Sequence, residues 1–204
     1  MAKESFDNSR YIALEGGDGS GKTTLSAALS KHLREMGEEA VEVREPGGTE
    51  LGETVRELLL DSDHVFPWAE AFLFAAQRAQ LAREVIAPAL ERGAWVISDR
   101  TYYSSIAYQG GARGLGRDRV REINEMGLEG VVPGSVFVIE VDPATALGRQ
   151  HREDRIGGEG AEFQARVREA YRAIAAEDPE RVFLLDGSMS VDDLVGAIVA
   201  VISR

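Results

Sequence analysis

The sequence predicts a three-layer α/β domain, with a doubly wound parallel sheet of five strands between helices. Short apolar runs recur along the chain, stretches of helical periodicity separate them, and a glycine-rich loop joins the first run to the first helical stretch. The expected strands are residues 11–14, 40–43, 95–98, 136–141 and 182–185. Four of these runs are almost continuously apolar, which is typical of parallel strands buried on both faces. Residues 40–43 alternate instead, and we expect them at an edge of the sheet.

Two of the expected helices carry clear signals. Residues 70–91 form a long helical stretch, and Pro88 is expected to bend its last turn because proline lacks a backbone N–H. Apolar side chains repeat at 3.6-residue spacing over residues 191–202, and Ser190 with Asp193 resembles a capping box at the start of this helix. In a doubly wound fold of this kind, ligands bind outside the carboxyl ends of the strands.

We expect a single domain over residues 1–204, a length that suffices for a sizeable core. Residues 1–9 are polar and are expected to be a loose N-terminal tail. Residues 150–161 are glycine-rich and of low hydrophobicity, so we expect them to form a short lid segment. No internal repeat and no linker interrupt the chain.

The overall composition excludes several classes of protein. A net charge of −12 makes a nucleic-acid-binding protein a poor prediction, since such binding depends on neutralising phosphates. The chain has no cysteine, which excludes disulfides and Cys-ligated zinc, and its three histidines show no metal-binding spacing. No apolar run is long enough to cross a membrane and no signal peptide is evident, so we expect a cytoplasmic protein without membrane contact.

The glycine-rich loop is the most informative motif. Residues 16–23 fit G-x-x-x-x-G-K-[ST], the pattern of a phosphate-binding loop, or P-loop. Its glycines let the backbone aim N–H groups at phosphate oxygens. Lys22 can place a positive charge against the β- and γ-phosphates, and the Thr23 hydroxyl can bind Mg²⁺. The alternative is a glycine-rich turn in which a lysine occurs by chance. The chain holds only three lysines, and an expected buried strand and a helical leucine stripe flank the loop, which favours the P-loop.

Two further strands end in charged residues. The run Arg44-Glu45-Pro46-Gly47-Gly48-Thr49 follows the second strand and would put a guanidinium beside the P-loop. Asp99 and Arg100 close the third strand. Asp99 could hold Mg²⁺ through water, and Arg100 could clamp a phosphate. The plain alternatives are a solvated arginine in a turn and a salt-bridged strand end.

Side chains suited to reading a base follow on two expected helices. Phe74 and Arg78 are four residues apart, so they share a helix face on which a ring could stack on a base and a guanidinium could meet its carbonyl edge. Taken alone, the pair is better explained as a helix core contact with a surface arginine, and only its combination with the other motifs favours a role in base binding. Polar groups able to contact a base or sugar follow Arg100, although they could also be an ordinary helix surface; they are Ser104, Ser105, Tyr108 and Gln109.

Arginines also lie in or beside the lid. Arg149, Arg152 and Arg155 could close over a triphosphate and shield it from water. The alternative is a solvated basic loop.

Taken together and in this order, the motifs resemble those of the bacterial thymidylate kinase family. The resemblance spans nearly the whole chain, and Arg-Glu-Pro-Gly-Gly-Thr with Ala-Tyr-Gln-Gly-Gly is far more specific than the P-loop. The residues that carry it are 15–24, 44–49, 74–81, Asp99-Arg100, 107–111 and Asp154-Arg155. It implies a P-loop NTPase fold and an ATP-dependent dTMP kinase that produces dTDP and ADP with Mg²⁺ in dTTP biosynthesis.

The resemblance also implies a role for each matching position. The ATP phosphates would be held by Gly16, Gly17, Asp18, Gly19, Ser20, Gly21, Lys22, Thr23 and Thr24. Asp18 would contact the dTMP sugar or position the phosphate-binding arginine. The dTMP phosphate would meet Arg44 and Arg100, while thymine would stack on Phe74 and meet Arg78. Ser104, Ser105, Tyr108 and Gln109 would line the base and sugar, and Arg152 or Arg155 would act on the transferring group.

The chain departs from the family pattern at two positions. Thr101 stands where the family usually has an aromatic residue or histidine, and Gly157 stands where a glutamate would follow the lid arginine. These departures concern the lid contacts more than the reaction. Position 19 is glycine, as in the bacterial type whose P-loop lacks its own arginine.

Other functions remain open from the residues alone. One is a kinase for another nucleoside monophosphate or for a deoxynucleoside. A GTP-driven switch would need an Asn-Lys-x-Asp motif, which the sequence lacks. An ATP-binding accessory protein would not need a clamp for an acceptor phosphate. The family resemblance implies a homodimer packed through helices.

Overall fold

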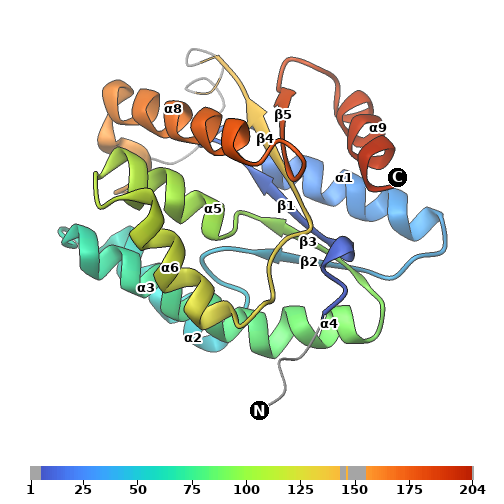
Figure 1. Ribbon diagram of the computed structural model, residues 1–204, viewed down its shortest axis with the longest axis horizontal. Coiled ribbons are helices and arrows are strands. Elements are labelled where there is room, and N and C mark those ends of the chain that lie inside the picture. Colours follow the sequence, from blue (N-terminus) through green and yellow to red (C-terminus); the bar gives the residue numbers. More distant parts are fainter. Residues whose placement is uncertain (1–5, 143–145, 147–154, 204) are drawn as a thin grey trace.

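The computed structural model describes residues 6–142, 146 and 155–203, and it has three layers (Figure 1). The middle layer is a parallel sheet of five strands in the order β2-β3-β1-β4-β5, which confirms the predicted doubly wound α/β fold. The strands are β1 (Tyr11–Glu15), β2 (Ala40–Arg44), β3 (Trp95–Asp99), β4 (Ser135–Glu140) and β5 (Val182–Asp186). Each lies within one residue of its predicted position at either end.

Both edges of the sheet differ from its centre. β2 lies at one edge, as its alternating sequence predicted. β5 lies at the other edge, where Leu184 is 44% exposed, so the expectation that this run is buried on both faces was wrong. An edge strand lacks a neighbour on one side, and therefore an apolar run does not guarantee burial there.

Helices cover both faces of the sheet (Figure 1). The α-helices are α1 (Lys22–Glu35), α2 (Glu50–Asp61), α3 (Pro67–Leu81), α4 (Ala87–Glu91), α5 (Tyr102–Ser105), α6 (Arg117–Leu128), α8 (Ala161–Glu177) and α9 (Val191–Ile202). Two π-helical segments, η2 (Ala82–Ile86) and η3 (Ile106–Ala112), and two 3₁₀ turns, η1 (Asn8–Arg10) and η4 (Gly157–Glu159), complete them.

The alternation of β1 divides the core into two clusters. Ile12 and Leu14 face the side covered by α1 and α9, where the leucine stripe of α1 is buried. Tyr11 and Ala13 face the opposite side, which α3, α4, α5, α6 and α8 cover. Because side chains on a strand alternate between faces, one apolar strand supplies both cores.

The long helical stretch starts earlier than predicted and contains an irregularity. It runs from Pro67 to Glu91, and its π-helical segment η2 lies just before Pro88. Pro88 cannot donate a backbone hydrogen bond, so the preceding turn widens instead of the last turn bending. The predicted cap of α9 is confirmed, because the Ser190 side chain accepts the N–H of Asp193 at 3.1 Å.

Within the part of the chain that the structure describes, none of the helices has the length and hydropathy that a membrane crossing requires. The cytoplasmic location stays a prediction from the sequence. The single-domain assignment and the loose tail at residues 1–9 also stay predictions.

Candidate active site

Parallel pairing brings the three charged strand ends to one edge of the sheet. Asp99 at the end of β3 lies in register with Leu14 of β1 and with Arg44 of β2. The P-loop leaves the end of β1 at the same edge. Motifs far apart in the sequence therefore meet where the predicted fold places ligands.

The P-loop needs its glycines for two reasons. Gly16 and Gly19 have φ angles of 133° and 75°, which side-chain-bearing residues rarely adopt. A Cβ on Gly16 would lie 2.5 Å from the carbonyl oxygen of Ile139, so β4 packs directly against the loop. Gly21, also at a positive φ, precedes the first residue of α1, so the positive end of the helix dipole faces the loop.

Lys22 folds back over the loop that precedes it. Its ammonium group donates to the carbonyl oxygen of Gly17 at 2.8 Å and to that of Gly16 at 3.2 Å. The residue is 6% exposed. Burial, together with the nearby Arg100 guanidinium, lowers the pKa of Lys22 to about 8, although neighbouring carboxylates oppose the shift. A phosphate in the loop would supply the negative charge that this ammonium group lacks.

The two predicted metal-binding residues are in contact. The Thr23 hydroxyl donates to the Asp99 carboxylate at 2.6 Å, which joins the start of α1 to the end of β3. Hydroxyl and carboxylate oxygens are the hard donors that Mg²⁺ prefers. The donor set therefore fits Mg²⁺ bound through one or two protein oxygens together with nucleotide phosphates and water.

Arg100 is held at the junction between the P-loop and the following helix. Its guanidinium donates to the carbonyl of Gly16 and to the Ser104 hydroxyl, both at 3.1 Å, and pairs with the Asp18 carboxylate. Its backbone φ is 73°, an uncommon value for a residue with a side chain, and such strain clusters at functional sites. The Tyr108 ring lies 5.3 Å beneath the guanidinium carbon.

Asp18 is therefore the partner of Arg100. Burial alone would raise the pKa of Asp18, but the charges of Arg100 and Lys22 outweigh it and hold that pKa below its ordinary value. The carboxylate is thus ionised at neutral pH. This geometry corresponds to one of the two roles that the sequence suggested for Asp18, namely the positioning of an arginine.

Glu15 organises the same junction, although the sequence assigned it no role. This fully buried carboxylate accepts hydrogen bonds from the backbone and hydroxyl of Thr101, from the Ser104 hydroxyl and from the Tyr171 hydroxyl. Ser104 in turn accepts from Arg100. The departure from the family pattern at Thr101 thus supplies two of the partners of Glu15. The sequence signal that could have identified Glu15 is its position, a charged residue between an apolar strand and the P-loop.

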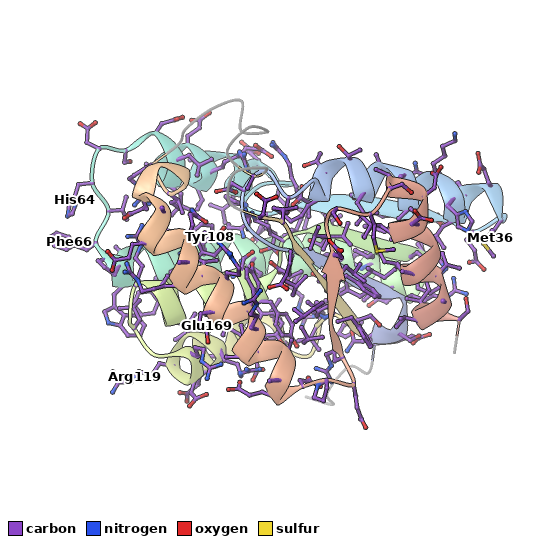
Figure 2. All side chains as sticks on the ribbon, turned by 90° about the horizontal axis from the view of Figure 1, so that it is seen from above. Met36, His64, Phe66, Tyr108, Arg119 and Glu169 are labelled. Atoms are coloured by element: carbon purple, nitrogen blue, oxygen red, sulfur yellow. The ribbon has the colours of Figure 1, made fainter. Side chains whose placement is uncertain are left out.

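A pocket lies beside Arg100. Seven residues that the sequence assigned to the second substrate line it together: Asp18, Phe74, Arg100, Ser104, Ser105, Tyr108 and Gln109. Figure 2 shows Tyr108 in the interior of the molecule beneath α8. A pocket with one aromatic wall and convergent polar groups suits a small organic ligand.

This pocket meets a second cavity, which the P-loop lines. Asp18, Glu45, Arg56 and Arg100 line both cavities, so they mark the place where the two spaces join. Lys22, Thr23 and Asp99 line the P-loop cavity but not the pocket beside Arg100. A group passing from one cavity to the other would cross this junction.

Arg56 is a site residue that the sequence reasoning missed. It lies on α2 and donates to the carbonyl oxygen of Pro46 at 2.8 Å, which directs it towards the junction. The sequence signal was weak, since Arg56 follows the Pro-Gly-Gly turn by two helical turns. Only the direction in which α2 leaves Thr49, its N-cap, brings this arginine to the site.

Two arginines that were predicted to contact the second substrate do not line the pocket beside Arg100. Arg44 pairs with Glu53 at 2.9 Å and lines the P-loop cavity but not the pocket beside Arg100. Arg78 is 2% exposed and lines neither cavity. Its side chain pairs with the buried Glu45 and donates to Ser105, which itself lines the pocket beside Arg100.

The lid is described only in part. Arg149 and Arg152 lie outside the described residues. Arg155 is described, and its guanidinium donates to the carbonyl oxygen of Leu59 at 3.0 Å and to the buried carboxylate of Glu70 at 2.7 Å. Arg155 is thus paired with α3 and does not line the P-loop cavity.

The sequence and the fold have clear relatives. A family model described as thymidylate kinase matches residues 14–198. Thymidylate kinase of Caldanaerobacter subterraneus is 44% identical over 185 residues, covering 89% of each protein. That of Leifsonia xyli is 44% identical over 193 residues, covering 92% of this chain and 91% of the relative. The crystal structure of thymidylate kinase from Ehrlichia chaffeensis has a TM-score of 0.80 and 31% identity, over 95% of this chain and 98% of that one. The chain therefore belongs to the thymidylate kinase family.

Proposed function

We propose that this chain transfers the γ-phosphoryl group of ATP to dTMP at the junction of its two cavities. The family supplies the reaction, an ATP-dependent phosphorylation that serves dTTP synthesis. The observation that carries the assignment to residues is the Asp18–Arg100 pair, which lines both cavities. ATP would place its phosphates in the P-loop cavity, and dTMP would occupy the pocket beside Arg100.

On the donor side, residues 16–24 would hold the ATP phosphates. The backbone N–H groups of the loop and the start of α1 favour negative charge there. Lys22 would leave its carbonyl partners for the phosphates. This suits a buried ammonium group to which no carboxylate of the described residues is hydrogen-bonded.

On the acceptor side, Phe74 would stack on thymine, while Ser104, Ser105, Tyr108 and Gln109 would line the base and sugar. Arg100 and Arg56 would bind the dTMP phosphate, since both lie at the junction. Arg44 would approach the same phosphate from the P-loop side after leaving Glu53. Arg78 would support thymine recognition indirectly, by donating a hydrogen bond to Ser105. Arg152 or Arg155 would act on the transferring group from the lid.

Thr23 and Asp99 would hold Mg²⁺, Asp99 directly or through water. The pair fits because two hard oxygen donors already meet beside the P-loop cavity. When bound, the ion neutralises charge on the β- and γ-phosphates.

The chemistry requires positioning more than proton transfer. The attacking oxygen of dTMP is already ionised near neutral pH, so no strong general base is needed. Arg100 and Lys22 would place positive charge on either side of the transferring group, and the pocket would align the two phosphates. Catalysis would thus come from in-line geometry and electrostatic stabilisation.

We also propose that the chain forms a homodimer through α2, α3 and α6. α2 and α6 each pack against α3. These helices and Phe66, the N-cap of α3, present exposed apolar side chains, namely Leu51, Leu58, Phe66, Trp68, Phe72 and Met126. Figure 2 shows Phe66 projecting outward at one end of the molecule. Sedimentation equilibrium tests this proposal: a dimer that Phe72→Arg converts to monomer supports it, and a monomeric wild-type protein contradicts it.

The experiment that tests the function is an ADP-release assay with ATP, Mg²⁺ and a panel of acceptors: dTMP, dUMP, dCMP, dGMP and thymidine. We expect the highest kcat/KM with dTMP. Absence of turnover with dTMP, or a higher kcat/KM with another acceptor, would overturn the proposed function.

A further inference from the structure

Tyr171 connects the helix that follows the lid to the junction of the two cavities. It lies on α8, which begins directly after residues 155–160 of the lid, and it is 2% exposed. Its hydroxyl donates to the Glu15 carboxylate at 2.7 Å and lies 3.0 Å from the Ser104 hydroxyl oxygen. Tyr171 lines neither the P-loop cavity nor the pocket beside Arg100, so any effect that it has on the reaction is indirect.

Neutral donors satisfy the buried Glu15 carboxylate. The backbone N–H and the hydroxyl of Thr101 donate to one of its oxygens, at 2.8 and 2.7 Å. The hydroxyls of Ser104 and Tyr171 donate to the other, at 2.5 and 2.7 Å. Among the described residues, no lysine or arginine forms an ion pair with Glu15. This carboxylate therefore accepts four hydrogen bonds without occupying a cation.

Two cations lie close enough to Glu15 to replace a missing donor. Only the Ser104 oxygen separates the Arg100 guanidinium from this carboxylate, because Ser104 accepts from Arg100 at 3.1 Å and donates to Glu15. Lys22 lies within electrostatic reach, since Glu15 is one of the carboxylates that oppose the lowering of the Lys22 pKa by burial. A buried carboxylate that loses a hydrogen bond favours the nearest available donor. Removal of a neutral donor would therefore draw a cation towards Glu15 and away from the phosphates.

We propose that Tyr171 is a positioning residue for phosphoryl transfer: its hydroxyl completes the neutral donors of Glu15 and so keeps the nearby cations available to the phosphates. These cations are Arg100 and Lys22, and the inference rests on the proposed function, which assigns both to the transferring group. It also makes their placement depend on α8, the helix that follows the lid. Misplacing a catalytic group by about 1 Å can lower a rate about 100-fold, so even a small shift of Arg100 is measurable.

Tyr171→Phe tests the proposal by removing a single oxygen atom. The ring keeps its edge-on contact with Tyr108, where the ring centres are 6.5 Å apart, so we expect the fold to be retained. The kcat/KM for dTMP at saturating ATP should fall by about tenfold or more, which is the effect of losing a hydrogen bond to a charged group. An ADP-release assay measures the change, and circular dichroism checks the fold. A wild-type kcat/KM in Tyr171→Phe overturns the proposal.

Glu15→Gln separates positioning from a merely structural role. It removes the charge that would attract Arg100 and Lys22, while the remaining side-chain oxygen can still accept from Thr101. In this background, Tyr171→Phe should lower kcat/KM by less than about twofold. Loosened packing would act in both backgrounds, so a loss as large as that in the wild-type chain overturns the proposal.

Thr101→Val removes another neutral donor from the same carboxylate. It takes away the hydroxyl and keeps the backbone N–H that donates to Glu15. We expect kcat/KM to fall in the same direction as in Tyr171→Phe, and this variant tests the mechanism even if one of the others does not fold. An unchanged kcat/KM in Thr101→Val contradicts the proposal.

Tyr11→Phe is the matched control. Tyr11 lies at the other end of β1 and is 1% exposed, and its hydroxyl is not among the donors to Glu15. We expect a lower Tm with an unchanged kcat/KM. An equal loss of kcat/KM would show that removing any buried hydroxyl has this effect, and it would overturn the proposal. Absence of dTMP turnover by the wild-type protein would instead refute the proposed function itself.

Discussion

Arg100 and Arg78 both follow recognisable motifs, yet their guanidinium groups have opposite surroundings. Arg100 keeps 17% of its side chain exposed and lines both cavities. Arg78 is buried, and four of its five N–H donors are used by Glu45, Ser105, Asn124 and the carbonyl of Thr101. An arginine that meets a ligand needs unsatisfied donors at a cavity. An arginine whose donors are already satisfied stabilises the wall behind it.

Replacing Arg100 tests this difference most severely. Arg100→Ala should lower kcat/KM for dTMP by roughly 10³-fold or more, because the transferring group loses a cation. The free energy of unfolding, measured by urea denaturation, should change little. Lys22→Ala should behave in the same way. Turnover close to that of the wild type in either variant would contradict the assigned roles.

Arg78→Met should show the reverse pattern. Removing the guanidinium leaves the Glu45 carboxylate buried without its cation, so the free energy of unfolding should fall by about 3–5 kcal/mol. Urea denaturation measures this loss, and the double variant with Glu45→Gln should recover part of it. A fully stable Arg78→Met protein with a 10³-fold lower kcat/KM would mean that Arg78 is chiefly a ligand contact.

The pKa of Lys22 provides a test of the donor side. Bound phosphates favour the ammonium form, so ATP binding should raise this pKa from about 8 and take up a proton at higher pH. The dissociation constant for ATP should be constant below pH 8 and rise up to about tenfold per unit above it. Calorimetric titration in buffers of different ionisation enthalpy measures the proton uptake. Lys22→Met should show neither the uptake nor this rise.

Arg44 should have the smallest effect. Its side chain is 54% exposed and already paired with Glu53, so its contribution to stability is expected to lie below about 1 kcal/mol. Arg44→Ala should raise the KM for dTMP by less than about tenfold and leave kcat nearly unchanged. Steady-state kinetics measure both, and a large fall in kcat would place Arg44 with Arg100 instead.

The sequence was most informative where a motif is local. The P-loop, the Asp99-Arg100 strand end and the Ser104–Gln109 segment each act through a short stretch of chain. The structure brings them together at one edge of the sheet, because the strands that precede them pair in parallel. The predicted strand positions hold for the same reason, since apolar runs between turns are local signals.

Contacts between residues far apart in the chain were harder to predict from the sequence. Glu15, Arg56 and Glu70 carry no local motif, and each acts through partners contributed by other elements. Glu15, for example, meets Tyr171 from a helix 156 residues away.

The sequence by itself determined the α/β class, the order of the strands and helices along the chain and the phosphate-binding chemistry, because these depend on periodicity and on residue types at short spacing. The tertiary structure decided which charged groups remain available. Arg78 looked like a ligand contact until four partners, 23 to 46 residues away in the chain, satisfied its donors. Saturation of hydrogen bonds and burial arise from packing between distant segments, and no short pattern of residues records them.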